Sequence, residues 1–269
     1  MCTGAVGALG NYIERAGVAT TSISLIREMS EAVVPPRALW VPFPLGRPLG
    51  AVDQPEFQKN VMRTAFGLLD TAREPTIEDY QIEAPDKGLS ENWACPLNLG
   101  PASSGSLADR FLAEVARLRP WASETRRERG RTLFGISGAR EDQVDQLARA
   151  LAAIAETGEV MCPPVSDEIT WAFEMPLLLR HIADDLRTFY HEAIAAQPAA
   201  NPPDHDALNR WIFTETVFGE TLGLVADGLT RASDSPVAQL VRGLLIPEGY
   251  YRGGSAFPEE TNFPTDSKN

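Results

Sequence analysis

The segment from Pro35 to Gly50, PPRALWVPFPLGRPLG, carries the densest local signals in the chain. The two prolines that open it end any preceding helix, because proline lacks an amide donor and its ring clashes with the preceding turn. Residues 38–42 then form a short apolar run that is typical of a strand. Further prolines end this strand, since proline cannot donate to a ladder of strands. The segment therefore predicts a strand that leads into a stiff loop.

The loop after this strand carries an arginine between two glycines. Gly46 and Gly50 bracket Arg47, and Asp53 is predicted to be the N-cap of the helix that follows. Strand, rigid loop and helix N-terminus is the order in which α/β layers present a site for a small anionic ligand. We therefore expect Arg37, Arg47, Gly46 and Gly50 to bind substrate. The alternative is a well-made connector that binds no ligand.

The flanking segments extend this pattern in both directions. Apolar residues at helical spacing predict helices over residues 4–16 and about 54–71, and residues 27–34 read as a short helix. Alternating β-branched residues predict a strand over 18–26. Helix, strand, helix, strand, helix is the alternation that builds a parallel sheet. Two strands make an incomplete sheet, which is either a fragment of a doubly wound layer or one that another subunit completes.

The fold class predicted for the whole chain is α+β. A small α/β layer with parallel strands is expected over residues 1–72, followed by an acidic linker with several prolines over 73–105. Residues 106–269 are expected to form a helical domain with a mobile tail from Gly253. Inside the linker, the sequence WACP at 93–96 is interpreted as an anchor, most simply a hydrophobic peg that holds the loop down.

Helical periodicity recurs through the second part of the chain. The first helix is expected to start at Ser106 and to break at Pro120, and residues 131–140 read as a short strand or loop. Further helices are predicted over 141–156, from 168 or 174 to 196, over 203–229 and over 237–245.

Charge and composition exclude several classes of partner. The 269 residues carry a net charge of −13, which argues against nucleic acid and anionic membrane surfaces because both require basic patches. No apolar run approaches the roughly 20 residues of a membrane span, and the N-terminus does not resemble a signal peptide. The cysteines number three, which fits a reducing compartment better than a disulfide framework. A cytoplasmic protein is therefore expected.

Two predicted helices place ionisable residues beside apolar stripes. His181, Asp185 and Glu192 line up along the edge of one stripe at spacings of four and seven residues. Glu215 falls in the middle of the other stripe, so we predict that its carboxylate is buried and paired, with His181, Arg180 or Arg187 as candidate partners. Histidine and carboxylates on facing helices hold metals in some bundles, so these residues are candidate ligands. The alternative is structural hydrogen bonding.

The cysteines differ in their predicted reactivity. Cys2 lies at the start of the first predicted helix, and a helix N-terminus lowers the pKa of a thiol. It is therefore a candidate catalytic thiolate, as Glu215 is a candidate catalytic carboxylate. Cys162 precedes two prolines and is predicted to be structural and the least reactive.

The motifs GNYIERAGVATTSISL and PPRALWVPFPLGRPLG, together with the helix that contains Gln58, carry a resemblance to a known family. Over residues 2–72 they look like the terminal part of the B component of glycine, sarcosine, betaine and D-proline reductases. The resemblance implies a redox-active selenocysteine or cysteine just before the first helix, where Cys2 matches the first position of the family's motif. Ala5 stands where the family has a second cysteine.

Three functions follow as hypotheses. The first is a reductase-like enzyme, or a subunit of one, that acts on a small anionic substrate through a cysteine thiol. The second is a non-catalytic subunit, with the incomplete sheet and the acidic linker as docking surfaces for a second protein. The third is a metal-dependent enzyme that uses the carboxylates and histidine of the helices.

Overall fold

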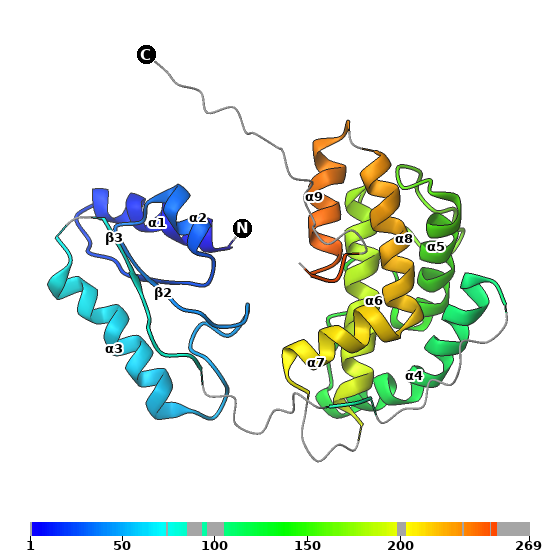
Figure 1. The fold of residues 1–269 in the computed structure, drawn as a ribbon, viewed down its shortest axis with the longest axis horizontal. Coiled ribbons are helices and arrows are strands. Elements are labelled where there is room, and N and C mark those ends of the chain that lie inside the picture. Colours follow the sequence, from blue (N-terminus) through cyan, green and yellow to red (C-terminus); the bar gives the residue numbers. More distant parts are fainter. Residues whose placement is uncertain are drawn as a thin grey trace. The chain divides into compact units, whose positions relative to one another are not determined.

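The computed structural model describes residues 2–73, 75–84, 93–95, 105–197, 203–232, 234–247 and 249–251. The chain divides into two compact units, residues 1–87 and residues 88–269 (Figure 1). The first is an α/β unit and the second is a helical unit, which agrees with the predicted α+β class.

The α/β unit is built around a small parallel sheet. Its elements are α1 (Cys2–Arg15), β1 (Ser22–Ser24), α2 (Arg27–Val33), β2 (Arg37–Trp40), α3 (Pro55–Thr71) and β3 (Thr76–Asp79). The strands pair in the order β1-β2-β3, and both pairings are parallel. The two predicted strands are thus present and parallel, although each is shorter than the segment that was predicted.

The third strand corrects the predicted domain boundary. β3 lies in the segment that we expected to be a linker from residue 73 onward, yet Ile77 pairs with Ala38 of β2. Its sequence, TIED, contains one apolar residue and therefore shows no strand pattern. Pairing with β2, whose Ala38 and Leu39 are fully buried, supplies the reason for the strand, because backbone groups need partners there.

Helix α3 covers the sheet with the apolar face that its sequence predicts. Val61, Ala65 and Leu68 are buried against a core that includes Leu39 of β2. The start of this helix differs from the prediction: Gln54 is the N-cap and makes no side-chain capping bond. Asp53 instead adopts a positive φ of 56°, so it belongs to the turn that precedes the helix.

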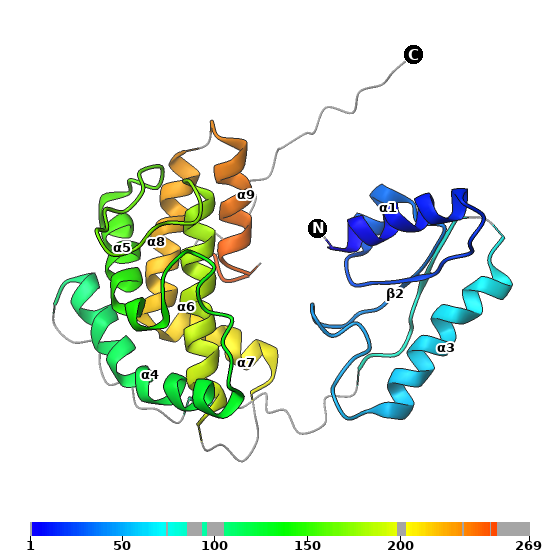
Figure 2. The ribbon, with the colours of Figure 1, turned by 180° about the vertical axis from the view of Figure 1, so that it is seen from behind.

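The helical unit is a bundle whose helices appear together in Figures 1 and 2. Its elements are α4 (Leu107–Arg129), η1 (Glu141–Gln143), α5 (Val144–Thr157), α6 (Leu177–Ala195), α7 (His205–Arg210), η2 (Trp211–Glu215), α8 (Val217–Arg231) and α9 (Pro236–Leu245). Helix α6 contacts α4, α5 and α9, and α8 contacts α4, α5 and α9. Each segment predicted to be helical in this region contains a helix, and residues 131–140 form a loop.

Helix α4 continues through Pro120, where the sequence predicted a break. The helix begins with the capping box of Ser106 and Asp109 and ends only at Gly130. Tertiary contacts hold the part beyond the proline in place: Thr125 is buried, and its hydroxyl donates to the carbonyl of Glu192 at 2.6 Å. These contacts outweigh the local cost of proline inside a helix.

The predicted helix over 203–229 is broken into three pieces. After α7, residues Trp211–Glu215 form a π-helical turn, and Thr216 is extended with φ −107° and ψ 155°. Thr216 then acts as the N-cap of α8, since its hydroxyl accepts a hydrogen bond from the amide of Gly219 at 3.0 Å. This break changes the face on which every residue before Thr216 lies relative to α8.

Candidate functional site

The predicted substrate-binding arginine of β2 is already paired. Arg37 forms an ion pair with Glu14 of α1 and donates to the carbonyl of Thr20 at 3.3 Å. Glu14 also accepts from the amide of Thr20 at 2.7 Å, and this hydrogen bond is the main cause that lowers the pKa of Glu14. Arg37 therefore ties α1 to β2, and the structure gives it a structural role.

The loop that carries Arg47 is shaped by its two glycines. Gly46 and Gly50 both have positive φ, of 86° and 84°. A side chain at Gly50 would also come within 2.8 Å of the ring of Phe57. Arg47 is exposed, and its amide donates to the carbonyl of Pro44 at 3.0 Å. Arg37 and Arg47 thus have different environments, one held in an ion pair and one on the surface of a tight turn.

The three cysteines occupy different settings. Helix α1 begins at Cys2, two residues before the predicted start at residue 4. The predicted anchor around Trp93 is confirmed, because its ring packs edge-on against Trp211 at 6.0 Å, and the half-buried Cys95 donates to Gln197 at 3.8 Å. Cys162 is exposed. This exposure does not support the interpretation of Cys162 as structural, because its side chain lies on the surface, and its low reactivity stays a prediction.

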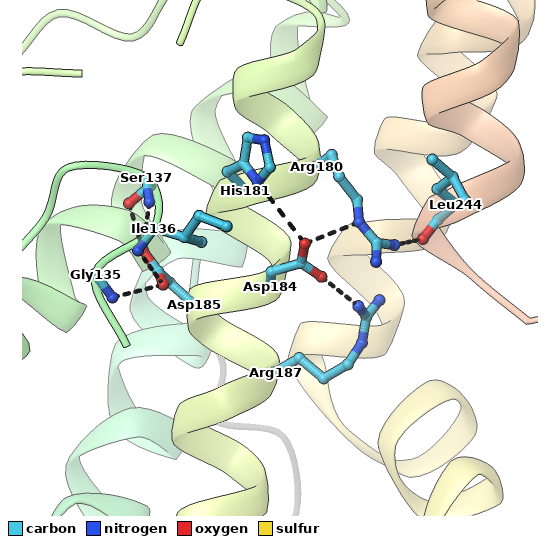
Figure 3. A network of polar contacts seen from close by, with 9 residues as sticks. All are labelled: Gly135, Ile136, Ser137, Arg180, His181, Asp184, Asp185, Arg187 and Leu244. Carbon is cyan, nitrogen blue, oxygen red and sulfur yellow. Dashed lines mark hydrogen bonds and ion pairs between the residues drawn. The ribbon is translucent and has the colours of Figure 1, made fainter. Parts of the chain in front are cut away.

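Asp185, a candidate metal ligand, is fully buried and held by the loop 131–140. Its carboxylate accepts from the amides of Gly135, Ile136 and Ser137 at 2.7, 3.0 and 3.0 Å, and from the Ser137 hydroxyl at 2.5 Å (Figure 3). These four donors satisfy both carboxylate oxygens. Asp185 therefore fixes the loop to α6, which is the structural alternative to metal binding.

Glu192 is held in a similar way two turns further along α6. It pairs with Arg126 at 2.6 Å and accepts from the hydroxyl of Thr132 at 2.6 Å. Among the residues for which the structure gives positions, no cluster of three or more histidine, cysteine, aspartate or glutamate side chains is arranged to hold a metal ion.

The cations predicted to pair with Glu215 pair with Asp184 instead. Arg180 and Arg187 each lie 2.8 Å from the carboxylate of Asp184, and His181 lies 3.9 Å from it (Figure 3). Arg187 also donates to the carbonyl of Leu245 at 2.7 Å, at the end of α9. This network joins α6 to the C-terminal carbonyls of α9, where a cation is favourable.

Glu215 is exposed, so the prediction of a buried carboxylate is wrong. The prediction assumed one continuous helix, in which Glu215 shares a face with Trp211 and Phe218. The π-turn and the extended Thr216 rotate it away from that face, while Trp211 and Phe218 remain buried. Its side chain instead lines a cavity at the start of α8.

This cavity of about 480 Å³ is the candidate functional site. It is lined by residues of the π-turn, the first turns of α8, and single residues from α4 and the C-terminal segment: Arg110, Phe213, Thr214, Glu215, Thr216, Val217, Gly219, Glu220, Gly223 and Tyr250. The rings of Phe213 and Tyr250 pack together at 5.6 Å. Arg110 forms two hydrogen bonds with Glu220, at 2.7 and 2.8 Å.

A buried carboxylate supports the wall of this cavity. Glu114 of α4 accepts from the amides of Val217 and Phe218 at 2.9 and 3.2 Å, and from the hydroxyl of Tyr190. Burial is the main cause that raises the pKa of Glu114, and burial also raises that of Tyr190. The first two backbone amides of α8 thus have a hydrogen-bond acceptor within the protein.

The sequence contains a signal for Glu114, although Glu114 is not among the residues predicted for a site. Glu114 lies within the apolar stripe of Leu107, Phe111, Val115 and Leu118, which is the pattern that was applied to Glu215. Here the helix is continuous, so the carboxylate is buried as the pattern requires. Arg110 and Glu220 lie on helices that are far apart in the sequence, so no local pattern predicts their pairing.

Comparisons of the chain with protein-family models, with curated proteins and with solved structures find no match. Across the part of the chain that the structure describes, none of the helices combines the length and the apolar character needed to cross a membrane.

Proposed function

We propose that the helical unit is a binding module for a small organic cation, such as an alkylammonium group, in the cavity beside the π-turn. The observation that carries this proposal is the position of Glu215 next to an aromatic pair. Glu215 lines the same cavity as Phe213 and Tyr250, and the rings of these two residues pack together. An ammonium group is attracted both by a carboxylate and by the faces of aromatic rings.

The charges of the residues that line the cavity favour a cation over an anion, and the guanidinium of Arg187, which is not part of the lining, lies 5.9 Å from the centre of the Phe213 ring. Among the described residues that line it, Arg110 is the one that is basic, and both terminal nitrogens of its guanidinium bind Glu220. Glu215 and Glu220 against Arg110 leave one net negative charge on this lining. Burial, and then the nearby Asp206, raise the pKa of Tyr250, while Arg210 acts in the opposite direction.

The π-turn gives the cavity its position. It presents Phe213, Thr214 and Glu215 next to the start of α8, where a continuous α-helix would have turned Glu215 inward. Such π-segments inside helices frequently occur at functional sites.

Isothermal titration calorimetry with tetramethylammonium chloride tests the proposal, with sodium acetate as the anionic probe. Glu215→Gln should weaken binding of tetramethylammonium by about tenfold, which corresponds to about 1.4 kcal/mol. Tyr250→Phe keeps the ring and should bind normally, whereas Tyr250→Ala should bind more weakly. Glu159→Gln is the matched control, because Glu159 lines a different hollow. Binding of acetate alone, or equal binding by wild type and Glu215→Gln, would contradict the proposal.

The resemblance of residues 2–72 to reductase B components supports a second candidate function, thiol chemistry at Cys2. One structural observation favours it, namely that α1 begins at this residue. A helix N-terminus favours a thiolate, so the alkylation rate of Cys2 should reach half its maximum at a pH below the ordinary thiol pKa of about 8.5. A half-maximum at or above that pH would remove this support.

A further inference from the structure

Helix α3 carries a stripe of exposed residues that its own unit does not cover. Lys59, Met62, Phe66 and Asp70 fall within about 80° of one another at 100° per residue, and all are exposed. Met62 and Phe66, in the middle of the stripe, expose 40% and 54% of their surface. Met62 and Phe66 are four residues apart on one helix, so their exposed surfaces are neighbours, and contiguous apolar surface of this kind can serve for interaction.

The apolar centre of this stripe continues onto the edge of the sheet. A hollow of about 400 Å³ is lined by Met62 and Phe66 together with Ile23 of β1 and Leu49. β1 is an outer strand of the sheet, so one of its edges has no neighbouring strand in the described part of the chain. Strand edges of this kind pair readily with another chain.

We propose that a second copy of this chain covers the stripe, with the two α3 helices antiparallel across a two-fold axis. The order of charges along the stripe is the reason to propose a second copy as the partner. Lys59 stands at the N-terminal end, Asp70 at the C-terminal end and the apolar pair between them, while the exposed Arg63 borders the stripe about 20° beyond Asp70. In an antiparallel pair, Lys59 faces Asp70 of the second copy and Met62 faces Phe66. The surface is thus complementary to itself, as a two-fold interface requires.

The two charges cannot meet within one chain. They are eleven residues apart on the same helix, which corresponds to about 16 Å along its axis. Lys59 pairs within the helix with Glu56 at 2.8 Å, but both side chains are largely exposed, and such pairs contribute little. Lys59 is therefore available to a partner without loss of a strong internal contact.

Sedimentation equilibrium of the full chain over a wide range of concentration tests the proposal. Wild type should show a monomer–dimer equilibrium, and Phe66→Glu should raise the dimer Kd by at least about tenfold. Leu9→Glu on α1 is the control, because Leu9 is exposed to 55% in the same unit but lies off the stripe. A monomer at all concentrations, open-ended oligomers, or a dimer that Leu9→Glu disrupts and Phe66→Glu does not, would overturn the proposal.

A charge exchange tests the antiparallel arrangement itself. Lys59→Asp and Asp70→Lys should each weaken the dimer, because like charges then face each other. The double variant should restore a Kd within about threefold of wild type, since the charges are complementary again across the axis. All these positions are exposed, so circular dichroism spectra that match that of wild type confirm that the variants fold. A double variant that is as weak as the single ones excludes this arrangement.

Discussion

The carboxylate of Glu114 accepts a hydrogen bond from the backbone amide of Val217 at 2.9 Å, across 103 residues of sequence. The amide of Phe218 and the hydroxyl of Tyr190 donate to the same carboxylate. One side chain of α4 thus caps α8 and contacts α6 at the base of the candidate site. A carboxylate suits this place because three donors converge on it and it can only accept when it is ionised.

Glu114→Gln should therefore destabilise the protein. The substitution keeps the shape, but the amide nitrogen of glutamine is a donor and meets other donors. A buried donor without an acceptor costs about 1–3 kcal/mol, which urea denaturation followed by circular dichroism would measure. Glu215→Gln, without ligand, is the control and should change the free energy of unfolding by less than about 0.5 kcal/mol, since Glu215 is exposed. A Glu114→Gln variant as stable as its control would show that the capping contacts contribute little.

The raised pKa of Glu114 also predicts a pH dependence. Burial, its main cause, makes the folded protein keep a proton on Glu114 at pH values where the unfolded chain has released it. The folded state then binds more protons, so this group lowers stability as the pH rises from the ordinary pKa of glutamate, 4.5, through the folded pKa. Relative to Glu114→Gln, wild type should lose stability across this window. Parallel curves for the two proteins from acid to neutral pH would contradict the assignment of this effect to Glu114.

Asp185→Asn should loosen the loop 131–140. Asparagine has one acceptor oxygen in place of two, so it cannot serve the three amides and the hydroxyl that bind Asp185. We expect a loss of about 2–3 kcal/mol in the free energy of unfolding. Asp142→Asn, which removes an exposed partner of Arg140, should have almost no effect. Because Asp185 is satisfied by protein donors, adding a chelator to wild type should leave its melting temperature unchanged.

The order of elements in the α/β unit followed from local patterns. Proline pairs, β-branched alternation and an apolar helical face predicted two parallel strands and three helices, because these patterns report which side of an element is buried. β3 was missed since its residues are mostly polar and its pairing with β2 depends on a tertiary neighbour. The continuation of α4 past Pro120 was missed for a related reason, namely the burial of Thr125.

The candidate site depends on the π-turn, which a search for helical periodicity in the sequence cannot detect. The stripe that contained Glu215 assumed 3.6 residues per turn throughout, and the π-turn breaks that period at Trp211–Glu215. Thr216 offered a local signal for a new helix start, because threonine is a favoured N-cap. The paired state of Arg37 could not be read from sequence, since Glu14 reaches it only after α1 folds beside β2.

Cys162 and Cys95 should react in an order that follows their exposure. Cys162 is exposed, whereas Cys95 is half-buried and donates to Gln197. Brief alkylation followed by peptide mass mapping should therefore modify Cys162 several times faster than Cys95, and the difference should vanish in urea. Cys2 is still predicted to be alkylated fastest of the three cysteines, because it lies at the start of α1. Faster labelling of Cys95 in the folded protein would mean that its segment does not pack against Trp211 and Gln197 as described.

Gly219→Ala should disrupt the start of α8 and with it the candidate site. A Cβ atom at this position would lie 2.3 Å from the carbonyl oxygen of Ile212 in the π-turn, so the turn or the helix must move. Overpacking of this kind costs about 1–3 kcal/mol, although alanine is the better helix former. Gly67→Ala in α3 is the matched control, because Gly67 is also helical and a Cβ atom there would meet nothing within 4 Å among the described residues. This substitution should stabilise the protein by up to about 1 kcal/mol.

Thermal and urea unfolding of both variants would measure the difference, and tetramethylammonium binding should weaken only in Gly219→Ala. Equal stabilisation by the two substitutions would show that the π-turn does not approach α8 as closely as described.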